Sequence, residues 1–154
     1  NGVVERRNRQ VNNMARTMLI ESGISRHYWK EAVEAAVHIQ NRTGLYMGET
    51  KTPYELWHER KPSLKYFRVF GSKCFIRNKE GNQGKYGDNA DEGIFLGYPM
   101  NSKAYKCFNK RLGKIVVSSD VKIIEEKTTN ASRTSYADKI ESEEVNVEKI
   151  QIQK

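Results

Sequence analysis

Five polar residues near the start of the chain have the types and the spacing to act together. Glu5 is followed by side chains at i+3, i+4, i+7 and i+11, which share one side of an α-helix; these are Asn8, Arg9, Asn12 and Arg16. Carboxylates bind hard metal ions, and arginine and amide side chains contact phosphates. The spacing alone favours a simpler explanation, in which Glu5 stands in the first helical turn and pairs with Arg9 to stabilise the helix.

Other familiar catalytic or metal-binding patterns do not occur in the sequence. Gly84 and Lys85 lie in a glycine-rich stretch, but Lys79 and Tyr86 replace the first glycine and the final Ser or Thr of a phosphate loop. Two cysteines cannot form a disulfide scaffold, which indicates the cytosol or the nucleus. The histidines and cysteines are too widely spaced for a zinc site; they are His27, His38, His58, Cys74 and Cys107.

Positive charge is concentrated in the first half of the chain. The 154 residues include 27 Lys and Arg against 19 Asp and Glu, a net charge of +8. Residues 1–77 carry 14 basic and 7 acidic side chains, residues 78–124 carry 8 and 5, and residues 125–154 carry 5 and 7. A basic folded region suggests a polyanionic partner, although a solvated basic surface would have the same composition.

The N-terminal region, about residues 3–60, has the pattern of three helices. Apolar residues of the first recur at helical spacing from Val4 to Leu19, and Ser22-Gly23 is a plausible end. Ser25 is a candidate cap for the second helix. A capping box formed by Thr52 and Glu55 predicts the third. The residues predicted to line one face of the second helix are Trp29, Val33, Ala36, Val37 and Gln40.

The pattern changes to short strands at about residue 64 and to a polar tail at about residue 125. Several short apolar and β-branched runs, with a hairpin turn at residues 109–113, predict a small antiparallel barrel. Residues 81–93 have the composition of a loop. Residues 127–154 lack apolar periodicity and are predicted to be disordered or linker-like. No apolar run is long enough for a membrane helix, and no signal peptide is visible. The absence of an initiator Met indicates a piece of a longer product.

Several separated motifs, in order along residues 1 to about 125, resemble a known family. They are NGVVERRNR…MARTML, YWKEAV…NR, KTPYELW, FRVFGSKCF and DEGIFLGY…KAY. Together they resemble the integrase region of copia-type long-terminal-repeat retrotransposon Pol polyproteins. The resemblance implies an α+β chain with three parts. Residues 1–60 would be the C-terminal helices of a truncated RNase H-like integrase core, residues 64–124 an SH3-like β-barrel, and residues 125–154 a disordered linker or tail.

The resemblance also implies a role for the predicted helix face. In the family, a Glu at the start of this helix completes an Asp, Asp, Glu set that binds two Mg²⁺ or Mn²⁺ ions for strand transfer. That Glu corresponds to Glu5, and the two Asp positions would lie upstream of this chain. Asn8, Arg9, Asn12 and Arg16 would then lie along the DNA. In retroviral relatives, the positions four and seven residues after the Glu are both basic. Arg9 agrees with this, but Asn12 does not, which puts a phosphate contact at the second position in doubt.

The same resemblance gives expectations for the chain on its own. Because the two Asp ligands are outside it, the chain is expected neither to bind metal nor to join DNA ends. In the parent protein, the expected partners are DNA, both that of the element ends and that of the target, and other integrase subunits. No membrane is expected as a partner. The expected location is the nucleus or a cytoplasmic virus-like particle. Cut from the rest of the core, the helices would leave Met14, Met18, Trp29 and Val33 exposed, and residues 64–124 would fold alone.

Two alternatives to an integrase fragment stay open. One is a non-catalytic nucleic-acid-binding remnant or domesticated module. The other is an interaction or structural protein whose basic surface is only solvated. Salt-dependent DNA binding separates the first alternative from the second.

Overall fold

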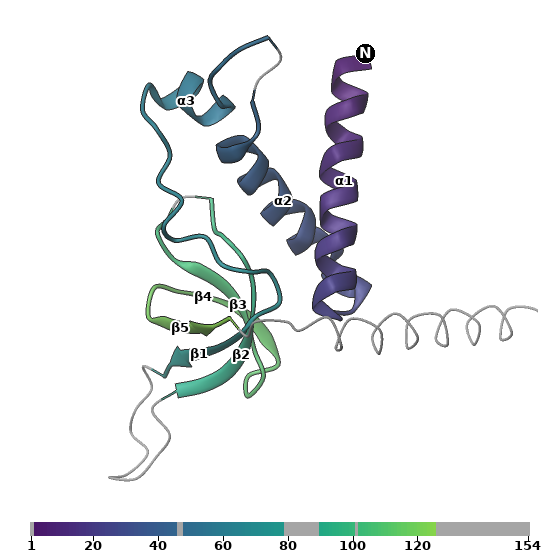
Figure 1. Ribbon diagram of the computed structural model, residues 1–154. Helices are drawn as coiled ribbons and strands as arrows, with labels where there is room; N and C mark the ends of the chain where they lie inside the picture. The colour runs from purple at the N-terminus through teal and green to yellow at the C-terminus, as the bar shows by residue number, and fades with distance from the viewer. Residues whose placement is uncertain (1, 46–47, 79–89, 101, 126–154) are drawn as a thin grey trace, which may run out of the picture.

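The chain folds as a group of helices followed by an antiparallel sheet (Figure 1). The computed structural model describes residues 2–45, 48–78, 90–100 and 102–125. The predicted tail and most of the predicted loop at residues 81–93 lie outside these ranges. Within them, no helix is both long and apolar enough to span a bilayer. The helices are α1 (Gly2–Ser22), the 3₁₀ helix η1 (Arg26–Tyr28), α2 (Trp29–Thr43) and α3 (Pro53–His58).

Local signals in the sequence fix most of the helix ends. Gly23 follows α1 with a φ of 65°, the left-handed conformation that favours glycine. Thr52 and Glu55 form the predicted capping box of α3: the Glu55 amide donates to the Thr52 hydroxyl at 3.2 Å, and the Thr52 amide donates to the Glu55 carboxylate at 2.8 Å. Ser25 caps η1 instead of starting α2 directly, because its hydroxyl accepts from the amide of His27.

Five strands form one antiparallel sheet in the order β4-β3-β2-β1-β5. They are β1 (Lys73–Arg77), β2 (Ala90–Gly97), β3 (Tyr105–Asn109), β4 (Lys114–Ser118) and β5 (Val121–Ile124). The α+β class with helices first is therefore confirmed. β2 begins at Ala90, so the expected loop at residues 81–93 is wrong in its last four residues, which pair with β1 and β3.

The predicted hairpin turn connects β3 to β4 and is held by a buried polar cluster. Asn109 accepts a hydrogen bond from the amide of Leu112, and Gly113 adopts a φ of 63°. Asp91 of β2 accepts from the Asn109 side chain at 2.8 Å and from Arg111 at 2.6 and 2.9 Å. These bonds lower the pKa of Asp91, that from Arg111 contributing most. The cluster fixes the register of the turn against β2.

A shared apolar core joins the helices to the sheet. Phe70 and Leu96 belong to the same buried cluster as residues of α1 and α2, which are Val11, Ala15, Leu19, Ala32, Ala35 and Ala36. Alanines on α2 allow a close approach, because a Cβ at Gly97 of β2 would lie 3.3 Å from the Cβ of Ala35. A second cluster lies within the sheet and includes Cys74, Phe95 and Cys107.

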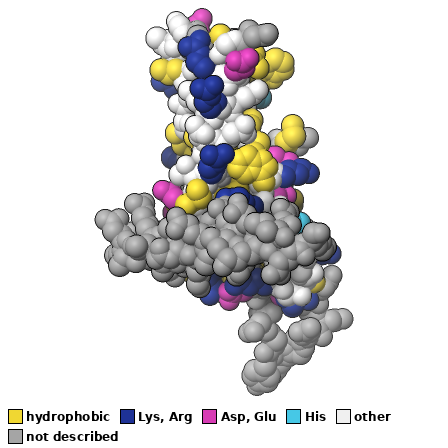
Figure 2. Space-filling model, turned by 90° about the vertical axis from the view of Figure 1, so that its right-hand side faces the viewer, with side chains coloured by type: hydrophobic (Ala, Val, Ile, Leu, Met, Phe, Trp, Pro, Cys, Tyr) yellow, Lys and Arg dark blue, Asp and Glu magenta, His cyan; other side chains and the backbone are white. Residues whose placement is uncertain are grey.

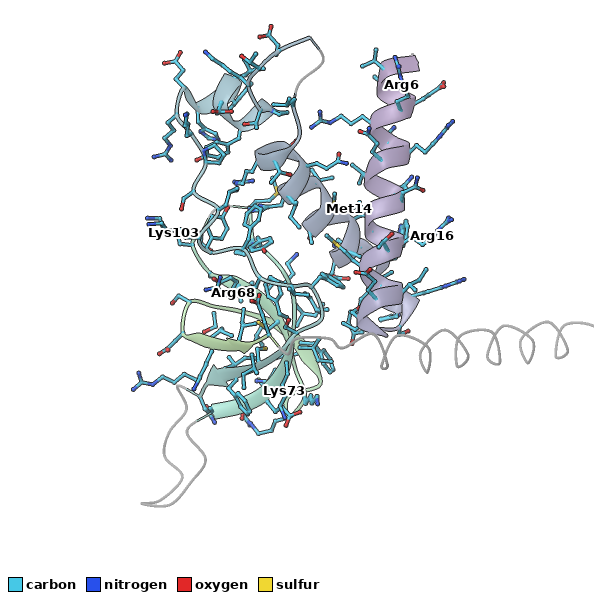
Figure 3. The ribbon with its side chains drawn as sticks, in the orientation of Figure 1. Arg6, Met14, Arg16, Arg68, Lys73 and Lys103 are labelled. Carbon is cyan, nitrogen blue, oxygen red and sulfur yellow. The ribbon has the colours of Figure 1, made fainter. Side chains whose placement is uncertain are left out.

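This core corrects the expectation that the helices would leave their apolar faces exposed. Met14, Met18 and Val33 are partly buried against the shared cluster, and Figure 3 shows Met14 between α1 and α2. Trp29 remains 39% exposed, as expected. The face predicted for α2 is also wrong in part, because Val37 is exposed while Ala32 and Ala35 are buried. The predicted domain boundaries at residues 60 and 64 stay a prediction.

His38 of α2 forms the main polar contact between the helices and the segment leading into the sheet. Its ring stacks on Tyr98 with a centroid separation of 4.4 Å, and its Nε2 lies 2.9 Å from the Tyr66 hydroxyl oxygen. Burial, with a smaller contribution from the charge of Arg42, lowers the pKa of His38 from 6.5 to about 4. The folded chain therefore favours the neutral imidazole.

Acidification is expected to destabilise the chain through His38. Because the pKa is lower in the folded chain, the unfolded chain binds the proton first. The stabilising contribution is complete above pH 6.5 and is lost as the pH falls towards 4. After allowance for partial solvent screening, the loss is about 1–2 kcal/mol. Urea unfolding between pH 7 and 4 measures it. His38→Phe should flatten this part of the profile, and an unchanged profile would contradict the assignment.

Candidate nucleic-acid interface

All five residues predicted from the N-terminal spacing lie on the solvent side of α1. The buried stripe of this helix, formed by Val11, Ala15 and Leu19, adjoins that side on the edge of Asn8 and Asn12. Figure 3 shows the side chain of Arg16 directed away from α2. The structure therefore brings the predicted set together on one exposed face, which we call the α1 outer face. Its members, each classed as exposed, are Glu5, Asn8, Arg9, Asn12 and Arg16.

The ion pair that the spacing alone favoured is not formed. Neither Glu5 nor Arg9 makes an ion pair or a side-chain hydrogen bond with any residue in the described part of the chain, and the same is true of Arg16. Both arginines are thus free to meet an external anion. Seven residues separate them, which corresponds to about 10 Å along the helix axis.

Neighbouring arginines on α1 have structural partners instead. Arg7 donates to the side-chain oxygen of Asn41 at 2.8 Å and so ties α1 to α2. Arg6 donates to the backbone oxygen of Gly2 one turn earlier. Figure 2 faces this side of the molecule and shows basic side chains, all of them arginines, succeeding one another down α1. The helix as a whole carries four arginines and two glutamates, so its field favours an anion.

The basic residues of the sheet differ from those of the α1 outer face because most of them are paired. Arg111 binds Asp91, Arg77 lies 3.2 Å from Asp120, and Lys106 binds Glu34 of α2. Lys73 and Lys110 both contact Glu92. An anion would have to compete with these carboxylates on the sheet, whereas on the α1 outer face it would not.

The residues of the α1 outer face do not fit a metal pair by themselves. Glu5 is the only carboxylate among them, and Glu21 lies about 24 Å further along the helix. In the described ranges, no group of three or more His, Cys, Asp or Glu side chains converges. Mg²⁺ held by protein needs several oxygen ligands in octahedral geometry. We therefore derive no metal-dependent step from this chain.

One exposed aromatic residue was missed by the sequence reasoning. Trp57 of α3 is 83% exposed, although the apolar pattern gave no reason to distinguish it from core residues. The exposed lysines and arginines that flank it in the sequence were the only available signal.

Comparisons with known proteins agree with this architecture. Residues 72–136 match the family described as retroviral polymerase SH3-like domain. The chain is 29% identical over 125 residues to the retrovirus-related Pol polyprotein from transposon RE1 of Arabidopsis thaliana, covering 81% of the chain and 8% of that relative. It is 28% identical over 135 residues to that from transposon TNT 1-94 of Nicotiana tabacum, covering 88% and 10%. The chain thus spans about a tenth of these relatives' length.

The SH3-like match starts one residue before β1, so the matched domain contains the five-stranded sheet and the helices precede it. The chain belongs to the copia-type retrotransposon Pol polyproteins and contains their SH3-like domain. The resemblance noted in its motifs is therefore confirmed.

Proposed function

We propose that this chain is the part of a retrotransposon integrase that joins the end of the RNase H-like core to the SH3-like domain. We further propose that it binds DNA along the α1 outer face. One observation carries the proposal: Arg9 and Arg16 share an exposed helix face and have no partner in the described structure. Relatives of the chain are Pol polyproteins, in which a DNA-facing surface has a use.

Within this proposal, each residue of the α1 outer face has a distinct role. Glu5 supplies one carboxylate of the strand-transfer centre in the intact parent, whose other ligands for Mg²⁺ or Mn²⁺ lie elsewhere in that protein. Asn8, Arg9 and Asn12 follow within two turns and position the DNA end. Arg16 is further down the helix and contacts only the backbone of the DNA. The positions of these residues along the helix axis follow from the rise of about 1.5 Å per residue.

The proposed partners and location follow from this role. They are the DNA of the element ends and of the target site, together with other integrase subunits of the parent. The chain would meet them in the nucleus or in a cytoplasmic virus-like particle.

Glu5→Gln separates the catalytic role from DNA binding. In a full-length Pol polyprotein carrying this segment, the substitution is expected to abolish DNA integration, because an amide cannot replace the carboxylate charge. In the 154-residue chain, the same substitution is expected to leave DNA binding largely intact, because it removes a metal ligand and not a phosphate donor. Integration assays on supercoiled target DNA and fluorescence anisotropy with a duplex measure the two effects. Integration at the wild-type level would exclude Glu5 from the catalytic centre.

A further inference from the structure

The short helix α3 presents an aromatic surface that the proposed function does not use. Trp57 is 83% exposed and Leu56 is 44% exposed. In the same helix, the rings of Tyr54 and His58 lie 4.3 Å apart, and the guanidinium of Arg42 lies 4.7 Å from the Tyr54 centroid. Arg42 and Tyr54 thereby fasten α3 to α2. Trp57 has no such role in the described structure, which leaves its ring free for an external partner.

The local structure fixes the backbone of the short helix that carries Trp57. The capping box of Thr52 and Glu55 fixes the first turn of α3. Glu59 ends the helix in the left-handed conformation, with a φ of 54°, and its amide donates to the Glu55 carbonyl at 2.9 Å. Figure 1 shows α3 beyond the end of α2, at the end of the molecule away from the sheet. Binding at Trp57 would therefore require little ordering of the helix that carries it.

Unpaired cations surround this helix. The side chains of the exposed residues Lys51, Arg60, Lys61 and Lys65 make no ion pair or hydrogen bond within the described part of the chain. The Glu55 carboxylate is occupied by the amide and hydroxyl of Thr52. Lys51 immediately precedes the Thr52 cap, and Lys61 follows the end of α3 by three residues. Hydrogen bonds from Thr52 lower the pKa of Glu55, and the charges of Lys61 and Lys51 lower it further. Only Glu49 and Glu59 oppose these four cations with carboxylates not engaged in the cap.

We propose that α3 is a second nucleic-acid site, which takes unpaired nucleotides of a single strand. A base stacks on the Trp57 ring, and the adjacent phosphates meet Lys51, Arg60 and Lys61. Aromatic stacking with a basic surround is how proteins bind single strands irrespective of sequence, and each stacked base contributes about 5- to 150-fold in affinity. A base inside a duplex cannot stack in this way. The inference rests on the proposed function, because it assumes that the chain acts on DNA.

Tryptophan fluorescence tests this site directly. The chain has two tryptophans, so Trp29→Phe leaves Trp57 as the sole emitter. Titration of this full-length variant with oligo(dT) is expected to quench the emission, and a duplex of the same length is expected to quench it much less. Unchanged emission at saturating oligo(dT) would overturn the proposal.

Substitution of Trp57 provides the second measurement. Trp57→Ala is expected to lower oligo(dT) affinity at least about fivefold, whereas Trp57→Phe retains most of it because a smaller ring still stacks. Circular dichroism should be unchanged, since the side chain is exposed. Equal affinities for all three chains would overturn the inference. The inference would also be overturned if the wild-type chain sedimented as a dimer and Trp57→Ala made it a monomer. That result would assign the surface around Trp57 to contact with a second copy of the chain.

The α1 outer face serves as the control that keeps the two proposals apart. Arg9→Gln is expected to weaken duplex binding and to leave the quenching of Trp57 by oligo(dT) unchanged. If Arg9→Gln loses duplex binding while oligo(dT) still quenches Trp57, the α3 site is supported independently of the α1 outer face. If the chain binds duplex normally but oligo(dT) does not quench Trp57, the α3 site is wrong and the α1 outer face is unaffected.

Discussion

Leu96→Ala is expected to destabilise the helices and the sheet together, by about 2–5 kcal/mol. Leu96 lies on β2, is 1% exposed and packs in the cluster that contains buried residues of α1 and α2. Its truncation removes apolar contacts and leaves a cavity that rigid alanines on α2 cannot fill. Urea unfolding followed by circular dichroism at 222 nm for the helices, and by hydrogen exchange of the amides of β1 to β5 for the sheet, measures the effect. A single shared transition is expected.

Phe95→Ala is the matched control, because Phe95 is equally buried and adjacent but belongs to the cluster within the sheet. Its expected cost is about 3–5 kcal/mol, again in one transition. If Leu96→Ala instead melts the helices while the strand amides stay protected from exchange, the sheet folds alone. That outcome would restore the expectation that residues 64–124 are autonomous and would contradict the shared core as a cooperative unit.

The sequence was most informative where a structure is determined locally. The capping box of Thr52 and Glu55, the glycine after α1 and the turn before Gly113 each depend on residues close together in the chain. Their physical causes, hydrogen bonds to free amides and the left-handed conformation of glycine, can be recognised without tertiary contacts. These elements were predicted correctly.

Packing between distant elements could not be predicted in the same way. Periodicity placed Val37 with Ala36 on one face of α2, but Val37 is 39% exposed whereas Ala36 is buried. The sheet approaches α2 so closely at Gly97 that alanines occupy the contact. Hydrophobicity alone does not distinguish a small residue at a close contact from a solvent-facing one. The exposure of Trp57 was missed for the same reason.

The sequence predicted which residues of the candidate site share a helix face, but it did not determine what those residues do. Helical spacing placed Glu5, Arg9 and Arg16 on one face, and the structure confirms that they share an exposed one. Whether Arg9 pairs with Glu5 depends on side-chain geometry, which spacing does not determine. The structure leaves both unpaired, and their roles in catalysis and DNA binding stay predictions.

Neutralising the two free arginines is expected to have the largest effect on DNA binding. Each phosphate contact contributes about −0.9 to the slope of log K against log salt on duplex DNA. If both arginines bind phosphate, Arg9→Gln with Arg16→Gln makes the slope shallower by about 1.8 and weakens binding equally for all sequences. If Arg9 instead reads a base edge, Arg9→Gln alone costs about 1–3 kcal/mol at the preferred sequence and hardly changes the slope.

Two exposed lysines on the edge strands of the sheet offer a control that removes the same charge. Lys114 begins β4 and Lys122 lies within β5, and neither has a partner in the described residues. Lys114→Gln with Lys122→Gln is expected to leave the slope nearly unchanged, because the proposed DNA contact lies on α1. If both double variants lost DNA affinity equally, the loss would reflect only the lower net charge of the chain.

The salt dependence of duplex binding is the most direct measurement of the α1 outer face. Fluorescence anisotropy gives the affinity of the 154-residue chain, of the double arginine variant and of the double lysine variant between 50 and 200 mM salt. We predict that the slope of log K against log salt becomes shallower by about 1.8 in the double arginine variant and not in the double lysine variant. Identical affinities and slopes for the wild-type chain and the arginine variant would contradict the assignment of α1 to DNA.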